Sequence, residues 1–420
     1  MDSIPYLRLQ GSKRLLNWRV AMTGRRFVIP GTLTRTLICS VILVAVVPAY
    51  AQTERVLHSF SSQHGDGEDP QAGLIFDRAG NLYGTTFGGG PFDWGTVFEI
   101  TSAGEENVLY AFGGKFPEGS HPNASLVFDK EGNLYGTTLL GGANNGGTVF
   151  ELTSAGVEEV LYSFGSQSGD GMSPYAGLMF DKKGTLYGTT YWGGAYGSGT
   201  VFEITSAGAE KVLYSFGSHL GDGSHPYYAG LVLGKAGKLY GTTYTGGAHG
   251  VGTVFEITSA GKEKVLYSFG GQPGDGWKPY AGVVFDKAGD LYGTTLLGGT
   301  YGAGTVFEIT SSGEEKVLYS FGSQSGDGDE PAASLVFDKA GNLYGTTSQG
   351  GVYGGGAGGY GTVFEITTGG TEKVICEFGA QSGDGYYPFS GSVLDGQGNL
   401  YGTTSQGGAY GLGTVFEVSP

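Results

Sequence analysis

The stretch PYAGLMFDKKGTLYGTTYWGGAYGSGTVFEITSAGAEKVLYSF, residues 174 to 216, decides the fold, because variants of it fill the chain from residue 54 to the end. Successive copies lie 52, 52, 53, 52, 52 and 57 residues apart. A fixed period of this length indicates a repeat architecture in which each copy is one supersecondary unit. LYGTT occurs in every copy, each time followed by GTVFE, and its tyrosines are Tyr83, Tyr135, Tyr187, Tyr240, Tyr292, Tyr344 and Tyr401.

Each copy contains four short segments with strand character. In the quoted unit they are residues 176–181, 185–190, 199–205 and 211–216, all rich in Val, Leu, Phe, Tyr and Thr. Turn residues follow the first and third segments, DKKG at 181–184 and SAG at 206–208. The pattern predicts a four-stranded antiparallel meander, and because both of its faces are apolar, neighbouring units have to cover them.

We therefore predict an all-β chain that forms a seven-bladed β-propeller with four-stranded antiparallel blades. The last copy ends after GTVFE, without its outer strand, and residues 54–60 (ERVLHSF) have the sequence of that missing strand. The N-terminal strand is thus expected to complete the seventh blade and close the ring, which removes an open sheet edge. In this interpretation the propeller comprises residues 52–420.

Residues 1–51 differ in composition from everything after them. They hold seven of the 23 Lys and Arg but one of the 39 Asp and Glu, and an apolar run at 37–47 precedes the sequence PAYA at 48–51. This is the pattern of a cleaved signal peptide, and the run is shorter than the ~20 residues of a membrane span. We expect a secreted or periplasmic bacterial protein with no membrane span in the mature chain.

The remaining chain is strongly acidic. Without residues 1–51 it has 16 Lys and Arg against 38 Asp and Glu, a formal charge of −22. Nucleic acid is therefore not an expected partner, because phosphate binding needs clustered Lys and Arg. A solvated acidic surface of this kind is typical of a soluble monomer.

Three motifs at this spacing, LYGTT, GG-x-x-G-x-GTVFE and GDG-x-x-P, carry a family resemblance. The chain resembles the Gly-Val-rich tandem repeat called GloVer, of the choice-of-anchor type, found in exported bacterial proteins. The resemblance implies an extracytoplasmic propeller-like repeat protein and implies no activity or catalytic residue. The chain ends at Ser419 and Pro420 without an evident sorting anchor.

The ionisable residues indicate no catalytic group, metal or cofactor. Each GDG motif offers one carboxylate, whereas Ca²⁺ takes 6 to 8 oxygen ligands, so these aspartates are predicted to cap turns. The GTVFE glutamates are predicted to pair with lysines of the next strand, as Glu203 with Lys211. A metal site needs three or four converging ligands, and the histidines are scattered: His58, His64, His121, His219, His225 and His249.

Aromatic residues in the loops after the second and fourth strands are the better candidates for binding. Exposed Tyr and Trp among Gly, Asp and Thr suit sugar rings, although the repeated tyrosines could instead cover the gaps between blades. We expect a binding module for polysaccharide or a surface protein, with a polysaccharide lyase or hydrolase and a purely structural protein as alternatives. An asymmetric site, if the protein has one, is expected near the expanded loop of blade 6 (351–361) and near Trp192 and Trp277, which depart from the repeat consensus. The candidate ligand-binding residues are Tyr191, Trp192, Tyr196, Tyr244, Trp277, Tyr280 and Tyr301.

Overall fold

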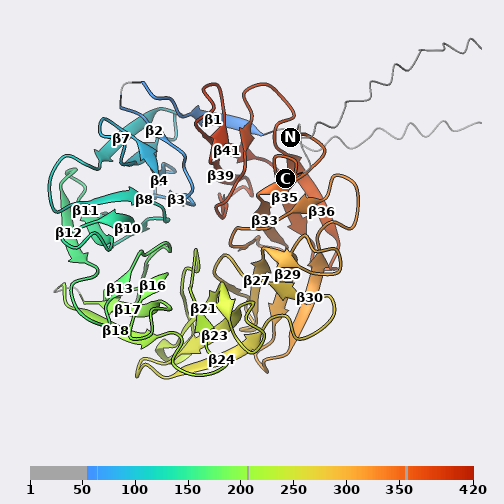
Figure 1. The fold of residues 1–420 in the computed structure, drawn as a ribbon. Coiled ribbons are helices and arrows are strands. Elements are labelled where there is room, and N and C mark those ends of the chain that lie inside the picture. The colour runs from blue at the N-terminus through green and yellow to red at the C-terminus, as the bar shows by residue number, and fades with distance from the viewer. Residues whose placement is uncertain (1–53, 64, 206–207, 355–357) are drawn as a thin grey trace, which may run out of the picture. The chain divides into compact units, whose positions relative to one another are not determined.

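The computed structural model describes residues 54–420 except 64, 206–207 and 355–357. The predicted signal segment, residues 1–51, lies outside the described residues. Seven antiparallel four-stranded blades, one of them extended by an additional short strand, follow one another around a ring (Figure 1), which confirms the predicted seven-bladed propeller. In the described part of the chain, the helical structure is a single 3-10 turn at Lys235–Gly237, and no helix there has the length and apolar character needed to cross a bilayer.

In blades 1 to 6 the strands run outward from the ring axis in chain order, and in blade 7 the outermost strand comes from the N-terminus. The innermost are β3 (Ile75–Phe76), β9 (Val127–Phe128), β14 (Met179–Phe180), β20 (Val232–Leu233), β26 (Val284–Phe285), β32 (Val336–Phe337) and β38 (Val393–Leu394). The second strands, which carry LYGTT, are β4 (Leu82–Thr86), β10 (Leu134–Gly141), β15 (Leu186–Thr190), β21 (Leu239–Thr243), β27 (Leu291–Thr295), β33 (Leu343–Thr347) and β39 (Leu400–Thr404).

The two outer positions are filled by longer strands. The third strands, which carry GTVFE, are β6 (Thr96–Ile100), β11 (Thr148–Leu152), β17 (Thr200–Ile204), β23 (Thr253–Ile257), β29 (Thr305–Ile309), β35 (Thr362–Ile366) and β41 (Thr414–Val418). The outermost are β7 (Glu106–Ala111), β12 (Glu158–Ser163), β18 (Glu210–Ser215), β24 (Glu263–Ser268), β30 (Glu315–Ser320), β36 (Glu372–Glu377) and β1 (Arg55–Ser59).

Short paired segments beyond these blades connect the loops. They are β2 (Gly67–Glu68) with β5 (Gly88–Gly89), β8 (Gly119–Pro122) with the end of β10, β13 (Gly171–Met172) with β16 (Trp192–Gly193), β19 (Gly223–Ser224) with β22 (Thr245–Gly246), β25 (Gly276–Trp277) with β28 (Leu297–Gly298), β31 (Gly328–Asp329) with β34 (Gln349–Gly350), and β37 (Gly385–Tyr386) with β40 (Gln406–Gly407). The sequence did not predict these pairs.

The innermost strands are shorter than predicted. In the quoted unit the prediction was 176–181, whereas β14 comprises Met179–Phe180. The carbonyl of the preceding Ala176 accepts from Thr137 Oγ1 of the neighbouring blade at 3.3 Å, and Ala176 and Gly177 line the axial channel, so this segment makes its contacts outside the sheet of its own blade.

The apolar core lies between neighbouring blades. The phenylalanine that ends each outer strand meets the GTVFE phenylalanine of the next blade edge to face, with ring centroids 5.0–5.2 Å apart. Both rings of each pair are buried. The first threonine of LYGTT adds a hydrogen bond to the next blade, as Thr189 Oγ1 donates to the carbonyl of Ala229 at 3.4 Å.

The N-terminal strand closes the ring, as predicted. β1 pairs antiparallel with β41, so that Arg55 stands opposite Glu417, and Figure 1 shows the blue and red strands side by side. Phe60 then makes the same edge-to-face contact with Phe98 of blade 1 that its counterparts make elsewhere. The first and last repeats are therefore joined by the same interactions as any other two.

Candidate binding face

The loops after the second and outermost strands emerge on one side of the ring, which we call the loop face. The short paired segments hold these two kinds of loop together: Met172 of β13 stands opposite Trp192 of β16, and Trp277 of β25 opposite Leu297 of β28. Backbone pairing fixes the position of both loops, so their side chains are presented from a rigid surface.

The residue before each loop proline is left-handed in all seven repeats, with φ between 54° and 59°, although none is glycine. Such a conformation costs a non-glycine residue about 1–3 kcal/mol and is often found at functional sites. Here backbone hydrogen bonds stabilise it: the Ser173 amide donates to Gly146 of the preceding blade, and its carbonyl accepts from Tyr191. The residues are Asp69, His121, Ser173, His225, Lys278, Glu330 and Tyr387.

Sequence variation among the repeats is concentrated on this face. LYGTT and GTVFE are identical in every copy, whereas the left-handed position carries six residue types and its neighbours vary as much. The residue after the proline is Gln71, Asn123, Tyr175, Tyr227, Tyr280, Ala332 or Phe389, and the residue after LYGTT is Phe87, Leu139, Tyr191, Tyr244, Leu296, Ser348 or Ser405. A constant scaffold thus presents a variable surface. Aligning the seven copies with one another would have revealed these positions from sequence.

The variable positions of blades 3, 4 and 5 form one continuous aromatic cluster. Tyr227 lies at its centre, with its ring centroid 4.6 Å from Tyr175, 5.0 Å from Tyr191 and 4.8 Å from Tyr280. Trp192 and His225 extend the cluster outward, 4.5 Å apart. We define the aromatic cluster as Tyr175, Tyr191, Trp192, His225, Tyr227, Tyr228, Tyr244 and Tyr280.

Burial shifts the pKa values of several ionisable groups in the cluster in the direction that favours the neutral form. Burial raises the pKa of Tyr227 to about 12 and raises the pKa values of Tyr175 and Tyr191. Burial also lowers the pKa of His225, which favours the neutral imidazole. The cluster therefore offers aromatic surface and neutral hydroxyl groups, with the Lys278 ammonium 5.1 Å from the Tyr244 ring centroid as its neighbouring charge.

Tyr228 connects the cluster to the mouth of the axial channel. It is the residue that lengthens this repeat to 53, because PYYAG replaces the PYAG of blades 3 and 5. Its hydroxyl donates to Gln71 Oε1 at 2.8 Å and accepts from Asn123 Nδ2 at 2.6 Å, so it reaches from blade 4 to blades 1 and 2. The cavity of the channel that it borders measures about 60 Å³.

Four of the seven candidate residues come together in this cluster: Tyr191, Trp192, Tyr244 and Tyr280. Trp277 is on the same face but packs beside Gly270, with half of its surface exposed. Tyr196 and Tyr301 are 58% exposed at the tips of their loops, beside Gly217 and Gly322. Tyr175, His225, Tyr227 and Tyr228 are not among the seven predicted residues, although the cluster depends on them.

The repeated carboxylates make turn-capping and sheet contacts, and the predicted pairing of GTVFE glutamates with lysines of the next strand holds in three blades. Asp170 caps its turn by accepting from the Ser166 amide at 2.8 Å and the Gly171 amide at 2.7 Å. Glu203 stands opposite Lys211 in the sheet, with Nζ 3.4 Å from its carboxylate. Glu308 and Glu365 lie near lysines of the outer strand in the same way, whereas Glu256 pairs with Lys238 of the second strand and Glu417 with Arg55.

Among the cavities outside the cluster are two that border blade 6. One of about 690 Å³ lies between blades 5 and 6 on the opposite face, and Tyr292 and Glu308, which belong to LYGTT and GTVFE, help to line it. Because these residues recur in every blade, this cavity does not mark one pair of blades as a binding site. The other, of about 420 Å³, opens on the loop face beside the expanded loop of blade 6, and its lining includes Gln349, Tyr360 and Gln406.

Fold and repeat together define a class of protein, the β-propeller built from seven tandem repeats. The sequence profile of the Gloeobacter/Verrucomicrobia repeat matches residues 42–231, and the chain therefore carries a tandem repeat of the predicted kind. A comparison with curated protein sequences finds no match.

Solved structures with the same fold include enzymes and extracellular domains. Virginiamycin B lyase from Staphylococcus aureus has a TM-score of 0.55 and 13% sequence identity, over 84% of this chain and 96% of the lyase. The extracellular domain of a hybrid two-component system from Bacteroides thetaiotaomicron has a TM-score of 0.57 and 13% identity, over 86% of this chain and 41% of that one. At such identities the likeness concerns the fold alone.

Proposed function

We propose that the protein is a recognition module that binds extracellular carbohydrate on the aromatic cluster of its loop face. The observation that carries the proposal is the contrast between invariant scaffold motifs and variable loop-face positions, which in blades 3 to 5 converge as aromatic side chains. Neutral aromatic surface bordered by hydroxyl groups suits the C–H faces and hydroxyls of sugars.

A location outside the cytoplasm is part of the proposal. The basic and apolar pattern of residues 1–51 supports it, as does the likeness to extracellular domains. An enzymatic role would call for paired acid and base groups, and the aromatic cluster contains no carboxyl group. Recognition is therefore favoured over catalysis.

The test is binding of the purified protein to a glycan and polysaccharide array, with Trp192→Ala and Tyr244→Ala as variants. Each substitution is expected to weaken binding about fivefold, since an aromatic contact contributes about 1 kcal/mol. Tyr410→Ala is the matched control, because Tyr410 is 60% exposed on a loop tip of blade 7. Absence of binding to any glycan would contradict the proposal, and release of new chain ends from a bound polysaccharide would identify an enzyme instead.

A further inference from the structure

Seven carboxyl pairs lie beside the loops that lead into the blades. Each joins the acid of the GDG loop to the glutamate at the start of the outer strand of the same blade. In every pair, burial and the neighbouring carboxylate raise the pKa of the strand glutamate. The pairs are Asp66 with Glu106, Glu118 with Glu158, Asp170 with Glu210, Asp222 with Glu263, Asp275 with Glu315, Asp327 with Glu372, and Asp384 with Glu54.

Each of these pairs contains a carboxylate oxygen with no partner. Among the described residues, one buried oxygen of every strand glutamate lacks a hydrogen bond, as do Oδ1 of Asp222 and Oδ1 of Asp275. Buried carboxylate oxygens are normally satisfied by hydrogen bonds, a proton or a cation. All seven pairs therefore share a buried glutamate oxygen that has no hydrogen-bond partner among the described residues.

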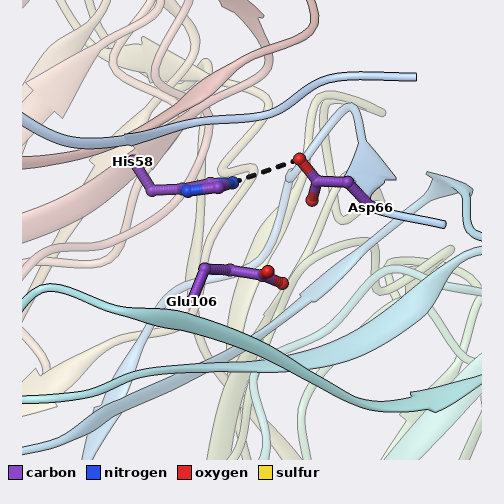
Figure 2. A group of neighbouring side chains, drawn as sticks. All are labelled: His58, Asp66 and Glu106. Carbon is purple, nitrogen blue, oxygen red and sulfur yellow. Dashed lines mark hydrogen bonds and ion pairs between the residues drawn. The ribbon is translucent and has the colours of Figure 1, made fainter. Parts of the chain in front are cut away.

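Two of the pairs have a histidine in addition. His58 replaces the tyrosine that five of the other six repeats carry and that donates to the acid of the loop, as Tyr162 does to Asp170 at 2.9 Å. Its Nε2 lies 3.2 Å from Asp66 Oδ2, and Figure 2 shows the imidazole directed at that carboxylate with Glu106 beside them. One ligand atom from each of His58, Asp66 and Glu106 lies within 4.8 Å of the other two.

The second histidine reaches its pair from the loop. His219 occupies the position that is glutamine in most repeats, and its Nε2 lies 3.7 Å from Glu263 Oε2. His219, Asp222 and Glu263 meet the same 4.8 Å criterion. Asp222 is 5% exposed and the Glu263 side chain 5%, and each has an oxygen without a partner among the described residues.

We propose that His58 with Asp66 and Glu106, and His219 with Asp222 and Glu263, each bind one divalent transition metal ion of the zinc class. An imidazole nitrogen and two carboxylate oxygens are the ligands such ions take, with water in the fourth position. The ion would offset the charge of both carboxylates and occupy the unpartnered oxygens. Sequence spacing gave no sign of these sites, because Glu106 comes 40 residues after Asp66 in the chain.

The His58 site would also reinforce closure of the ring. His58 lies on β1, Glu106 on β7, and Asp66 on the loop between blades 7 and 1. A shared ion therefore connects the strand that completes the last blade to the first blade. Because binding requires these elements to be assembled, the ion stabilises the folded state.

The experiment titrates the untagged full chain with Co²⁺ and follows ligand-field absorption, with thermal unfolding in Zn²⁺ and in chelator measured in parallel. Two equivalents are expected for the wild type, one each for His58→Tyr and His219→Gln, and none for the double variant. Both substitutions install the residue that other repeats carry, so the variants should melt like the wild type in chelator. Zn²⁺ is expected to raise the melting temperature of His219→Gln more than that of His58→Tyr.

Two results would overturn the proposal. One is fewer than two equivalents bound by the wild type. The other is unchanged stoichiometry in the double variant, which would mean that the histidines are not ligands. The five pairs without histidine act as internal controls, since carboxyl pairs that sufficed alone would bind more than two equivalents.

Discussion

The glycine of each LYGTT motif is required because a phenylalanine ring lies against it. A Cβ on Gly188 would come within 2.5 Å of Phe202 Cζ and 2.9 Å of Leu178 Cδ2. Phe202 is fully buried and contacts Phe164 of the preceding blade, so it cannot move aside. The invariance of this glycine therefore reflects packing rather than backbone freedom.

Gly188→Ala is accordingly expected to destabilise the protein by about 1–3 kcal/mol through overpacking. Urea denaturation measures the change. Gly230→Ala is the matched control, because a Cβ there meets nothing within 4 Å, and its effect should stay within about 0.5 kcal/mol. Equal effects of the two substitutions would contradict the packing explanation.

The strand β1 is the element on which closure of the ring depends. It supplies the outer strand of blade 7 by pairing with β41, and the adjacent Phe60 is fully buried against Phe98. Glu54, at its start, places its carboxylate on the backbone amide of Gly385. Without this element β41 becomes an exposed edge strand.

A chain that begins at Ser61 should therefore be much less stable than one that begins at Glu54. Loss of a buried phenylalanine alone costs about 3–5 kcal/mol, and the unpaired edge favours aggregation. Thermal unfolding and light scattering of the two chains make the comparison. If both melted at the same temperature, closure by β1 would have no energetic role.

For the molecule as a whole, the carboxyl pairs make stability depend on pH. Burial and the facing Asp275 raise the pKa of Glu315 from 4.5 to about 7, against the hydrogen bond from Tyr267. The pKa of Glu210 is raised to about 7 in the same way by burial and by Asp170, and the hydrogen bond with Tyr162 opposes this shift. The pKa of Glu372 is raised to about 7 by burial and by Asp327, and hydrogen bonds with Tyr319 and Gln324 oppose this shift.

A raised carboxyl pKa means that the folded state holds the proton more tightly than the unfolded chain. The stabilisation is complete below about pH 4.5 and is lost as the pH rises through 7. In chelator, the protein should be more stable at pH 5 than at pH 8, by about 1 kcal/mol per pair after solvent screening. Urea denaturation at the two pH values measures the difference.

The triple variant Glu210→Gln, Glu315→Gln, Glu372→Gln should reduce this difference, because glutamine stays neutral at both pH values. The matched control replaces three GTVFE glutamates that lie near lysines, Glu203, Glu308 and Glu365, with glutamine. It changes the net charge equally but leaves the buried pairs intact. A pH dependence reduced equally by both triples would assign the effect to net charge.

The sequence by itself determined the blade, the number of blades and the closure of the ring. Those features depend on local patterns, namely the turns at DKKG and SAG, the apolar strand segments and the 52-residue period. The missing last strand and its match at residues 54–60 are also visible in the sequence. A repeat with these patterns buries the apolar faces of its sheet against the neighbouring repeats.

Tertiary structure alone decided which side chains meet. The loops place Tyr191 beside Tyr227, and the inserted Tyr228 reaches Gln71, 157 residues earlier in the chain. Glu106 faces Asp66 and His58 because the outer strands and loops of neighbouring blades meet where the ring closes. These contacts depend on the angle and spacing between blades, which follow from the packing of buried phenylalanines and are not encoded in any single repeat.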